Sequence, residues 1–207
     1  PAQSDLDFIR ENKFDRVFNP LSPHTRPDWY NHFHMTEETC RMLNMPFDGN
    51  LQCELGLFRG QEFPVDKKLI TMSLWASGNQ ESKSPKIEVI EKLSQELGRN
   101  GYQLVQIGRG DRIIKDVENL GSNLSLGDGV RLVKSSVLHI SIDCGWGWIA
   151  SAYQRPVVGM FGLNYPDMQP GRQASHNPFN PNATYINKNS VKDVGFDELY
   201  DVIIGKL

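Results

Sequence analysis

The sequence has few cysteines, no long apolar run and no signal-peptide features. Its 207 residues include Cys40, Cys53 and Cys144, an odd number with irregular spacing. This usage predicts free thiols in a reducing compartment and excludes a disulfide framework or a cysteine-based zinc site. Apolar runs fall well short of the roughly 20 residues that a membrane-spanning helix needs. The opening residues, 1–5, lack the character of a signal peptide. We therefore expect a soluble, cytoplasmic protein with no transmembrane segment.

An excess of positive charge is also absent. Lysine and arginine number 22 against 25 acidic residues, which gives a formal net charge of −3. A general nucleic-acid binder needs a basic surface that displaces counterions from phosphates, so we expect no nucleic-acid partner. Apolar residues make up 39% of the chain and aromatic residues 10%, which suits an ordinary globular core.

Strand and helix patterns alternate along the last two thirds of the chain. Apolar runs predict strands over residues 69–74, 103–107, 137–142, 157–161 and 184–186. Helices are predicted over residues 85–99, 113–120, 125–135, 144–152 and 196–204. Such alternation implies a parallel sheet with right-handed crossovers. The predicted fold class is therefore α/β, a Rossmann-like parallel sheet with flanking helices.

The first 66 residues show a shorter and less regular pattern. Helices are predicted over residues 4–12 and 28–43, and strands over residues 14–21 and 51–58. Residues 59–66, which include Pro64, are typical of a linker. A glycine-rich opening turn is missing, so this pattern predicts a partial α/β segment over residues 1–66. Residues 67–207 are then expected to form the main domain.

The most informative stretch joins two of the predicted strands. The strand over residues 137–142 runs into Asp143, Cys144 and Gly145, and the strand over residues 157–161 ends at Gly162. The carboxyl ends of neighbouring parallel strands form the edge where open α/β sheets bind ligands. Glycines there let backbone N–H groups approach a phosphate, and the start of a helix adds a partial positive charge. The stretch therefore predicts an anion-binding edge.

This stretch also resembles a family signature. Residues 143–152, DCGWGWIASA, and 156–166, PVVGMFGLNYP, resemble D-[ST]-G-x-x-H-x-A-x-A and P-x-x-x-x-[FY]-G-x-[TS]-x-P of the lipopolysaccharide heptosyltransferases, which form glycosyltransferase family nine. The likeness extends upstream and covers about residues 67–207. Two positions depart from the signature, because Trp148 replaces the histidine and Cys144 replaces the usual serine or threonine.

The resemblance implies a fold, a reaction and partners. Enzymes of this family have the two-domain GT-B fold, whose carboxyl-terminal domain binds the nucleotide sugar and whose amino-terminal domain binds the carbohydrate acceptor. They invert the sugar's configuration and need no metal ion, and here no Asp-x-Asp motif stands beside the glycine turns. Residues 67–207 would thus be the nucleotide-sugar-binding half of a hexosyl- or heptosyltransferase, with no cofactor beyond the donor substrate.

The general base of the family lies in a part of the first domain that has no match in residues 1–66. A missing amino-terminal domain or a partner subunit would then supply it, and we expect the chain alone to bind donor but to transfer sugar poorly. The other possibility is a non-catalytic binding or assembly module that retains the fold.

Ten residues are candidates for the nucleotide-sugar site. They are Ser77, Gly78, Lys83, Asp111, Leu126, Asp143, Cys144, Gly145, Gly162 and Asn164. Lys83 would supply a positive charge to the diphosphate, unless Lys86 does so or Lys83 is merely solvated. Asp143 would organise the binding loop or cap the following helix. Asp111 would bind the ribose or cap a helix, and Leu126 would contact the base or pack in the core.

Three further features have alternative interpretations. Trp146 and Trp148 would offer a stacking face to a sugar or base, although we expect at least one to pack inward as the helix's core anchor. The histidines at positions 24, 32 and 34 lie partly on a predicted helix, where residues two apart diverge by about 200°, so exposure is favoured over metal binding. We do not expect Cys144 to be a nucleophilic thiol, because no histidine adjoins it in sequence.

Overall fold

A computed structural model describes residues 46, 64–75, 83–108, 113–121, 124–162 and 180–207. The chain divides into two compact units, Pro1–Asn50 and Leu51–Leu207, and the described helices and strands all belong to the second. The elements predicted before residue 64 and the loop predicted over residues 163–179 lie outside the described residues.

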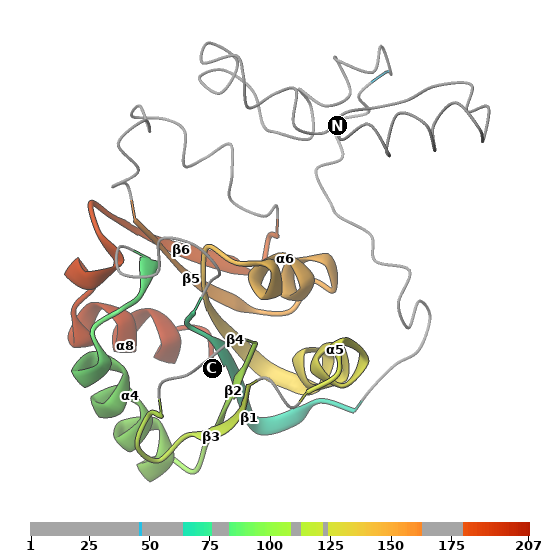
Figure 1. Ribbon diagram of the computed structural model, residues 1–207, viewed down its shortest axis with the longest axis horizontal. Coiled ribbons are helices and arrows are strands. Elements are labelled where there is room, and N and C mark those ends of the chain that lie inside the picture. Colours follow the sequence, from blue (N-terminus) through green and yellow to red (C-terminus); the bar gives the residue numbers. More distant parts are fainter. Residues whose placement is uncertain (1–45, 47–63, 76–82, 109–112, 122–123, 163–179) are drawn as a thin grey trace, which may run out of the picture. The chain divides into compact units, whose positions relative to one another are not determined.

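The described strands form one parallel sheet of six strands in the order β3-β2-β1-β4-β5-β6 (Figure 1). The strands are β1 (Asp66–Ser73), β2 (Gln103–Ile107), β3 (Glu118–Gly121), β4 (Ser136–Ile142), β5 (Val157–Gly162) and β6 (Ala183–Lys188). Successive strands add on one side of β1 as far as β3 and then on its other side from β4. This is the Rossmann order, so the predicted fold class is confirmed. The order reverses between β1 and β4, and the crevice outside the carboxyl ends of those strands is where such sheets bind ligands.

Helices cover both faces of the sheet (Figure 1). One apolar cluster includes residues of α4 (Ile87–Arg99) and α8 (Phe196–Ile204), and the other includes residues of α5 (Leu126–Ser135) and α6 (Gly145–Ala152). A short 3₁₀ helix, η3 (Val191–Asp193), leads toward α8. Because α4, α5 and α6 each follow a parallel strand, they run back from the carboxyl edge of the sheet toward its amino edge. The first residues of α5 and α6 come within a few residues of the strands before them, so these two helices begin at the carboxyl edge.

The amphipathic pattern of α4 explains both its packing and its end. Ile90, Leu93 and Leu97 recur at helical spacing and are almost fully buried. Gly101 then adopts a φ of 82°, and its N–H donates to the Gly98 carbonyl at 2.9 Å while the Tyr102 N–H donates to the Leu97 carbonyl at 3.0 Å. This pair of bonds is the Schellman motif, which satisfies helix-end carbonyls and suits glycine. The helix begins at Ile87, two residues later than predicted, with Lys86 at the N-cap.

The helix predicted over residues 113–120 is wrong, because residues 118–121 form β3. Ile114, Val117 and Leu120 fit a helical spacing, but Asp116 has a φ of 62° and interrupts any helix. Of the three, Ile114 alone is buried, and Val117 and Leu120 are half-buried. The open edge of β2 satisfies the backbone instead, since Val105 pairs with Glu118 in parallel register. Pairing with a distant strand thus overrides the local pattern.

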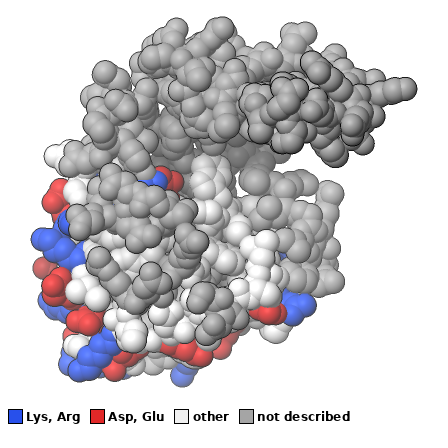
Figure 2. Space-filling model, in the orientation of Figure 1, with Lys and Arg blue, Asp and Glu red and all other residues white. Residues whose placement is uncertain are grey.

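The described surface carries mixed charge. Figure 2 shows acidic and basic side chains interspersed on this face, over the region of α4 and α8. Lys188 Nζ lies 2.8 Å from Glu198 Oε1, and Arg131 Nη1 lies 3.1 Å from Asp128 Oδ1. Every helix among the described residues is too short or too polar to cross a membrane.

Candidate functional site

Three strands end at nearly the same level at the carboxyl edge of the sheet. Ser73 of β1 pairs with Ser141 of β4, and Ile142 of β4 pairs with Met160 of β5. Asp143 and Cys144 follow β4 directly and lead into α6. The amino terminus of α6 therefore lies at the β1–β4 reversal point, which is the geometry of an anion site in a Rossmann-like sheet.

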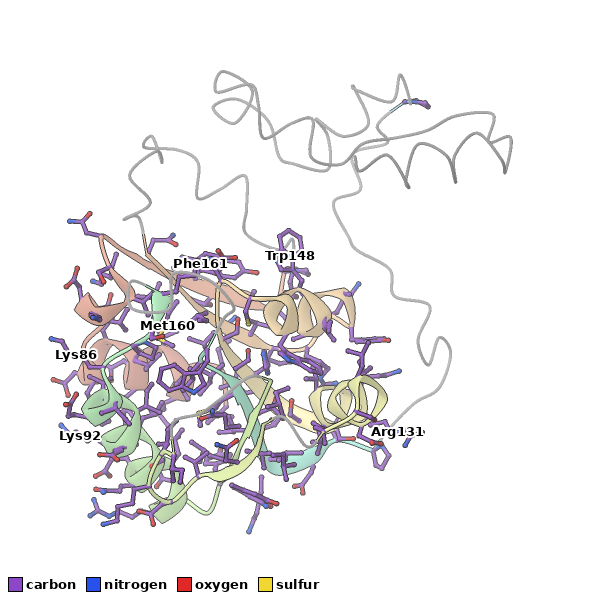
Figure 3. The ribbon with its side chains drawn as sticks, viewed as in Figure 1. Lys86, Lys92, Arg131, Trp148, Met160 and Phe161 are labelled. Atoms are coloured by element: carbon purple, nitrogen blue, oxygen red, sulfur yellow. The ribbon has the colours of Figure 1, made fainter. Side chains whose placement is uncertain are left out.

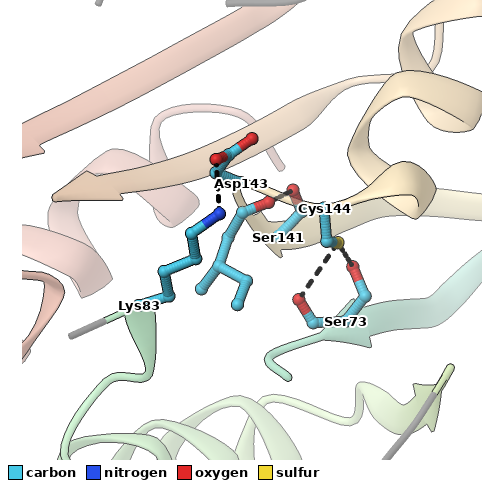
Figure 4. A network of polar contacts seen from close by, with 6 residues as sticks. Ser73, Lys83, Ser141, Asp143 and Cys144 are labelled. Atoms are coloured by element: carbon cyan, nitrogen blue, oxygen red, sulfur yellow. Dashed lines mark hydrogen bonds and ion pairs between the residues drawn. The ribbon is translucent and has the colours of Figure 1, made fainter. Parts of the chain in front are cut away.

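A half-buried ion pair lies at this edge. Lys83 Nζ is 2.9 Å from Asp143 Oδ2, and the two side chains are 19% and 33% exposed (Figure 4). The residues are 60 positions apart in sequence, so the fold brings them together. Lys86 is exposed at the N-cap of α4. The alternative in which Asp143 caps α6 is wrong, because Cys144 occupies that N-cap. The pair orients the Lys83 ammonium at the edge of the sheet.

The residue at the N-cap of α6 does not cap the helix with its side chain. Cys144 has extended backbone angles at the N-cap, but its thiol makes no hydrogen bond to the helix. Instead Cys144 Sγ lies 3.2 Å from Ser73 Oγ and 3.9 Å from the Ser73 carbonyl oxygen (Figure 4). The first N–H groups of a helix lack intrahelical partners and carry partial positive charge. An anion can therefore bind where a capping side chain would otherwise do so.

Gly145, the first residue of α6, is exposed and sterically unconstrained. A Cβ atom built there would meet no atom of another described element within 4 Å, and the φ of Gly145 lies outside the left-handed region. Packing and backbone conformation therefore do not require glycine at this position. A glycine does leave the neighbouring N–H groups open to close approach by a ligand.

The two tryptophans of α6 have different environments. A Cβ atom on Gly108 would lie 2.7 Å from Trp146 Nε1, and one on Gly129 would lie 2.2 Å from Trp146 Cη2. Trp146 thus packs between the end of β2 and α5, which confirms that one of the two tryptophans anchors the helix. Trp148 is half-buried and projects from the side of α6 that faces away from α5 (Figure 3).

Sequence reasoning missed the polar residues beneath Cys144. Ser73 Oγ also lies 3.0 Å from His139 Nε2, and His139 Nδ1 lies 2.9 Å from Thr71 Oγ1. His139 is fully buried, and this burial lowers its pKa from 6.5 to about 3. The sequence did contain a pattern that could have indicated these residues, because polar side chains occupy alternate positions of two otherwise apolar strands. These are Thr71 and Ser73 in one strand and His139 and Ser141 in the other.

The structure places six of the ten candidate residues. Lys83, Asp143, Cys144 and Gly145 lie together as described, and Gly162 ends β5 beside β4. Leu126 is 56% exposed at the start of α5, so it is not a core residue. The other four, Ser77, Gly78, Asp111 and Asn164, lie outside the described residues. The same holds for the histidines at positions 24, 32 and 34 and for Cys40 and Cys53.

Cys144 is a free thiol. Across the described ranges, no cluster of three or more histidine, cysteine, aspartate or glutamate side chains is arranged to hold a metal ion.

The fold has counterparts among solved structures. The fold is similar to E. coli ADP-heptose lipopolysaccharide heptosyltransferase II, with 17% identity and a TM-score of 0.55 over 82% of this chain and 50% of that one. It is similar to E. coli heptosyltransferase WaaC with ADP, with 13% identity and a TM-score of 0.61 over 84% and 55% of the two chains. A family 9 glycosyl transferase from Veillonella parvula gives 14% identity and a TM-score of 0.64 over 87% and 61%.

The chain thus spans between 50% and 61% of the length of these three proteins. A comparison with curated protein sequences gives no match. Residues 50–198 match the model of glycosyltransferase family 9 (heptosyltransferase). That match extends over well more than half of the sequence, and on this ground the chain belongs to glycosyltransferase family 9.

Proposed function

We propose that the chain binds a nucleoside-diphosphate sugar at the carboxyl edge of its sheet, as the donor-binding half of an inverting glycosyltransferase that needs no metal ion. The observation that carries this proposal is the convergence of Lys83, Asp143 and the uncapped start of α6 where the strand order reverses. Family membership adds independent support.

The edge offers the right charges for a departing diphosphate. When an acceptor hydroxyl attacks the anomeric carbon, the bond to the diphosphate breaks and negative charge grows on the leaving oxygen. The N–H groups of Gly145 and Trp146 and the ammonium of Lys83 would stabilise that charge, as preorganised donors do in a partly desolvated site. Two neutral hydrogen-bond donors and one cation would thus stabilise the leaving group without a metal ion.

An ADP-linked heptose is the donor that we propose to test first. Two of the similar structures are of WaaC with ADP and with ADP-2-deoxy-2-fluoro heptose. We further propose that Leu126 contacts the base, because it is exposed at the start of α5 on the same edge. The acceptor would be a carbohydrate bound by a further domain or a partner subunit, which would also carry the general base. The reaction would take place in the cytoplasm.

Trp148 favours one alternative, a binding module without catalysis. It stands where the family signature has histidine, and an indole offers phosphate one neutral N–H donor, whereas a protonated imidazole offers two donors and a positive charge. Release of ADP from ADP-heptose on addition of heptose-deficient lipopolysaccharide would identify an enzyme. Donor binding with no such release, even with the partner domain present, would identify a module.

Calorimetric titration of the chain with ADP, UDP, GDP and ADP-heptose tests the proposal. We expect micromolar binding of one nucleotide, unchanged by a chelator. The matched variants are Lys83→Ala and Lys86→Ala, which remove the same charge three residues apart. Loss of a charged hydrogen bond is worth about 1.5–3 kcal/mol, so Lys83→Ala should weaken binding about tenfold to a hundredfold. Lys86→Ala should leave binding unchanged. If none of the ligands binds, the proposal is wrong.

A further inference from the structure

A line of buried polar side chains crosses the interface between β1 and β4. Thr71 and Ser73 of β1 are 0% and 1% exposed, and Ser136 and His139 of β4 are both 0% exposed. They lie among the apolar residues that α5 and α6 cover, such as Leu69. Burial of polar groups is unfavourable unless each is hydrogen-bonded. A set of this size in the central strands of a sheet therefore calls for a specific role.

The side chains form a continuous series of contacts that ends at the candidate site. Ser136 Oγ lies 2.9 Å from the Val133 carbonyl oxygen and 3.1 Å from Thr71 Oγ1. Thr71 Oγ1 contacts one nitrogen of His139, and Ser73 Oγ contacts the other. Ser73 Oγ in turn contacts Cys144 Sγ. We call Ser136, Thr71, His139, Ser73 and Cys144 the buried network.

The direction of every hydrogen bond in the buried network follows from its first member. A carbonyl only accepts, so Ser136 donates its single hydroxyl proton to Val133. Thr71 must then donate to Ser136, and it can only accept from His139 Nδ1. Burial lowers the pKa of His139 to about 3, so the ring is neutral and its Nε2 carries no proton. Nε2 therefore accepts from Ser73.

This order determines what Cys144 does. With its proton committed to His139, Ser73 Oγ is left to accept the proton of the Cys144 thiol. The Ser73 carbonyl, at 3.9 Å, also faces that thiol. The thiol is thus directed toward β1 and does not cap the first N–H groups of α6.

We propose that His139 is a positioning residue for the nucleotide site. Acting through Ser73, it holds the Cys144 side chain against β1 and keeps the first turn of α6 open to a phosphate. This inference rests on the proposed function, since it assigns the buried network to the loop that would bind the diphosphate. It goes beyond that function by assigning a role to residues that do not touch the ligand.

The tautomer of His139 gives a test on the unaltered chain. Nuclear magnetic resonance of the ¹⁵N-labelled histidines, with His139 assigned from a His139→Asn variant, reports which nitrogen carries the proton. We expect a proton on Nδ1, none on Nε2, and no change between about pH 8 and about pH 5, where exposed histidines titrate. A proton on Nε2, or a doubly protonated ring, would overturn the inference.

Two buried serines provide a matched test of the link to binding. Ser73→Ala interrupts the buried network. Ser94→Ala removes an equally buried hydroxyl on α4, which shares its proton between the carbonyls of Glu91 and Lys115. With ADP as the probe, we expect Ser73→Ala to weaken binding about fivefold to tenfold. Ser94→Ala should bind as the wild type does, although both variants should melt at lower temperatures.

The outcomes separate this inference from the proposed function. Wild-type chain that binds none of ADP, UDP, GDP and ADP-heptose refutes both. Wild-type chain that binds while Ser73→Ala binds equally well refutes the positioning role alone, as does equal weakening by Ser94→Ala. If Ser73→Ala does not fold, the tautomer measurement still decides.

Discussion

Substitution of Gly145 by alanine should separate binding from stability. The added methyl group would meet nothing within 4 Å, and the backbone there does not require glycine. Alanine is a better helix former than glycine by up to about 1 kcal/mol, and it reduces the entropy of the unfolded chain. We therefore expect the free energy of unfolding of Gly145→Ala to stay the same or rise by as much as about 1 kcal/mol.

Binding should change in the opposite direction. The methyl group would stand at the first turn of α6, where the proposed phosphate approaches the N–H groups of Gly145 and Trp146. A phosphate displaced from these donors loses at least one charged hydrogen bond, so affinity for ADP should fall about tenfold or more, or about 1.4 kcal/mol. Urea unfolding and calorimetric titration measure the two effects separately.

Gly98→Ala is the matched control. Gly98 lies near the end of α4, and a Cβ atom there also meets nothing within 4 Å. The control should gain similar stability and bind ADP as the wild type does. If Gly145→Ala binds ADP with wild-type affinity, the assignment of the phosphate to the start of α6 is refuted.

Two further predictions concern stability. Gly129→Ala should lower the free energy of unfolding by about 1–3 kcal/mol, because its Cβ would lie 2.2 Å from Trp146 Cη2. A urea midpoint equal to that of the wild type would contradict the packing of Trp146. Acid should also weaken the fold, because His139 stays neutral when folded, with a pKa of about 3, but binds a proton when unfolded below its ordinary value of 6.5. The free energy of unfolding should therefore fall by up to about 1.4 kcal/mol for each pH unit below about 6.5. In urea titrations at several pH values, His139→Asn should reduce this dependence of stability on pH. An equal dependence in both proteins would show that His139 is not the cause.

Local patterns were sufficient where tertiary contacts agree with them. The strand Gln103–Ile107 and the helix Phe196–Ile204 have the predicted bounds, since apolar runs and periodicity coincide there with burial. Residues 113–120 show the opposite case. Their apolar spacing suits a helix, yet Asp116 and the open edge of β2 direct the chain into a strand. The open edge of β2 exists only once the sheet has formed, so the sequence of residues 113–120 alone could not indicate it.

The sequence predicted which segments of backbone meet at the candidate site, but it did not predict which side chains contact one another there. Asp143 and Gly145 come after β4, and Gly162 ends β5, so their place at one edge follows from the order of elements. The pairing of Lys83 with Asp143 joins residues that are 60 positions apart, and no local pattern indicates it. Likewise the contact of Ser73 with His139 depends on the register of β1 against β4, which aligns Ser73 with Ser141. Register of this kind emerges only from the assembled sheet.

The most direct test of the central claim is a map of backbone amide shifts during titration with ADP. The account predicts that the amide signals of Gly145 and Trp146 shift progressively and saturate with the calorimetric affinity, because these N–H groups would donate to the diphosphate. Amides at the opposite edge of the sheet, such as those of Gly101 and Gly205, should not move. Saturating shifts confined to other parts of the chain, with Gly145 and Trp146 unchanged, would contradict the account.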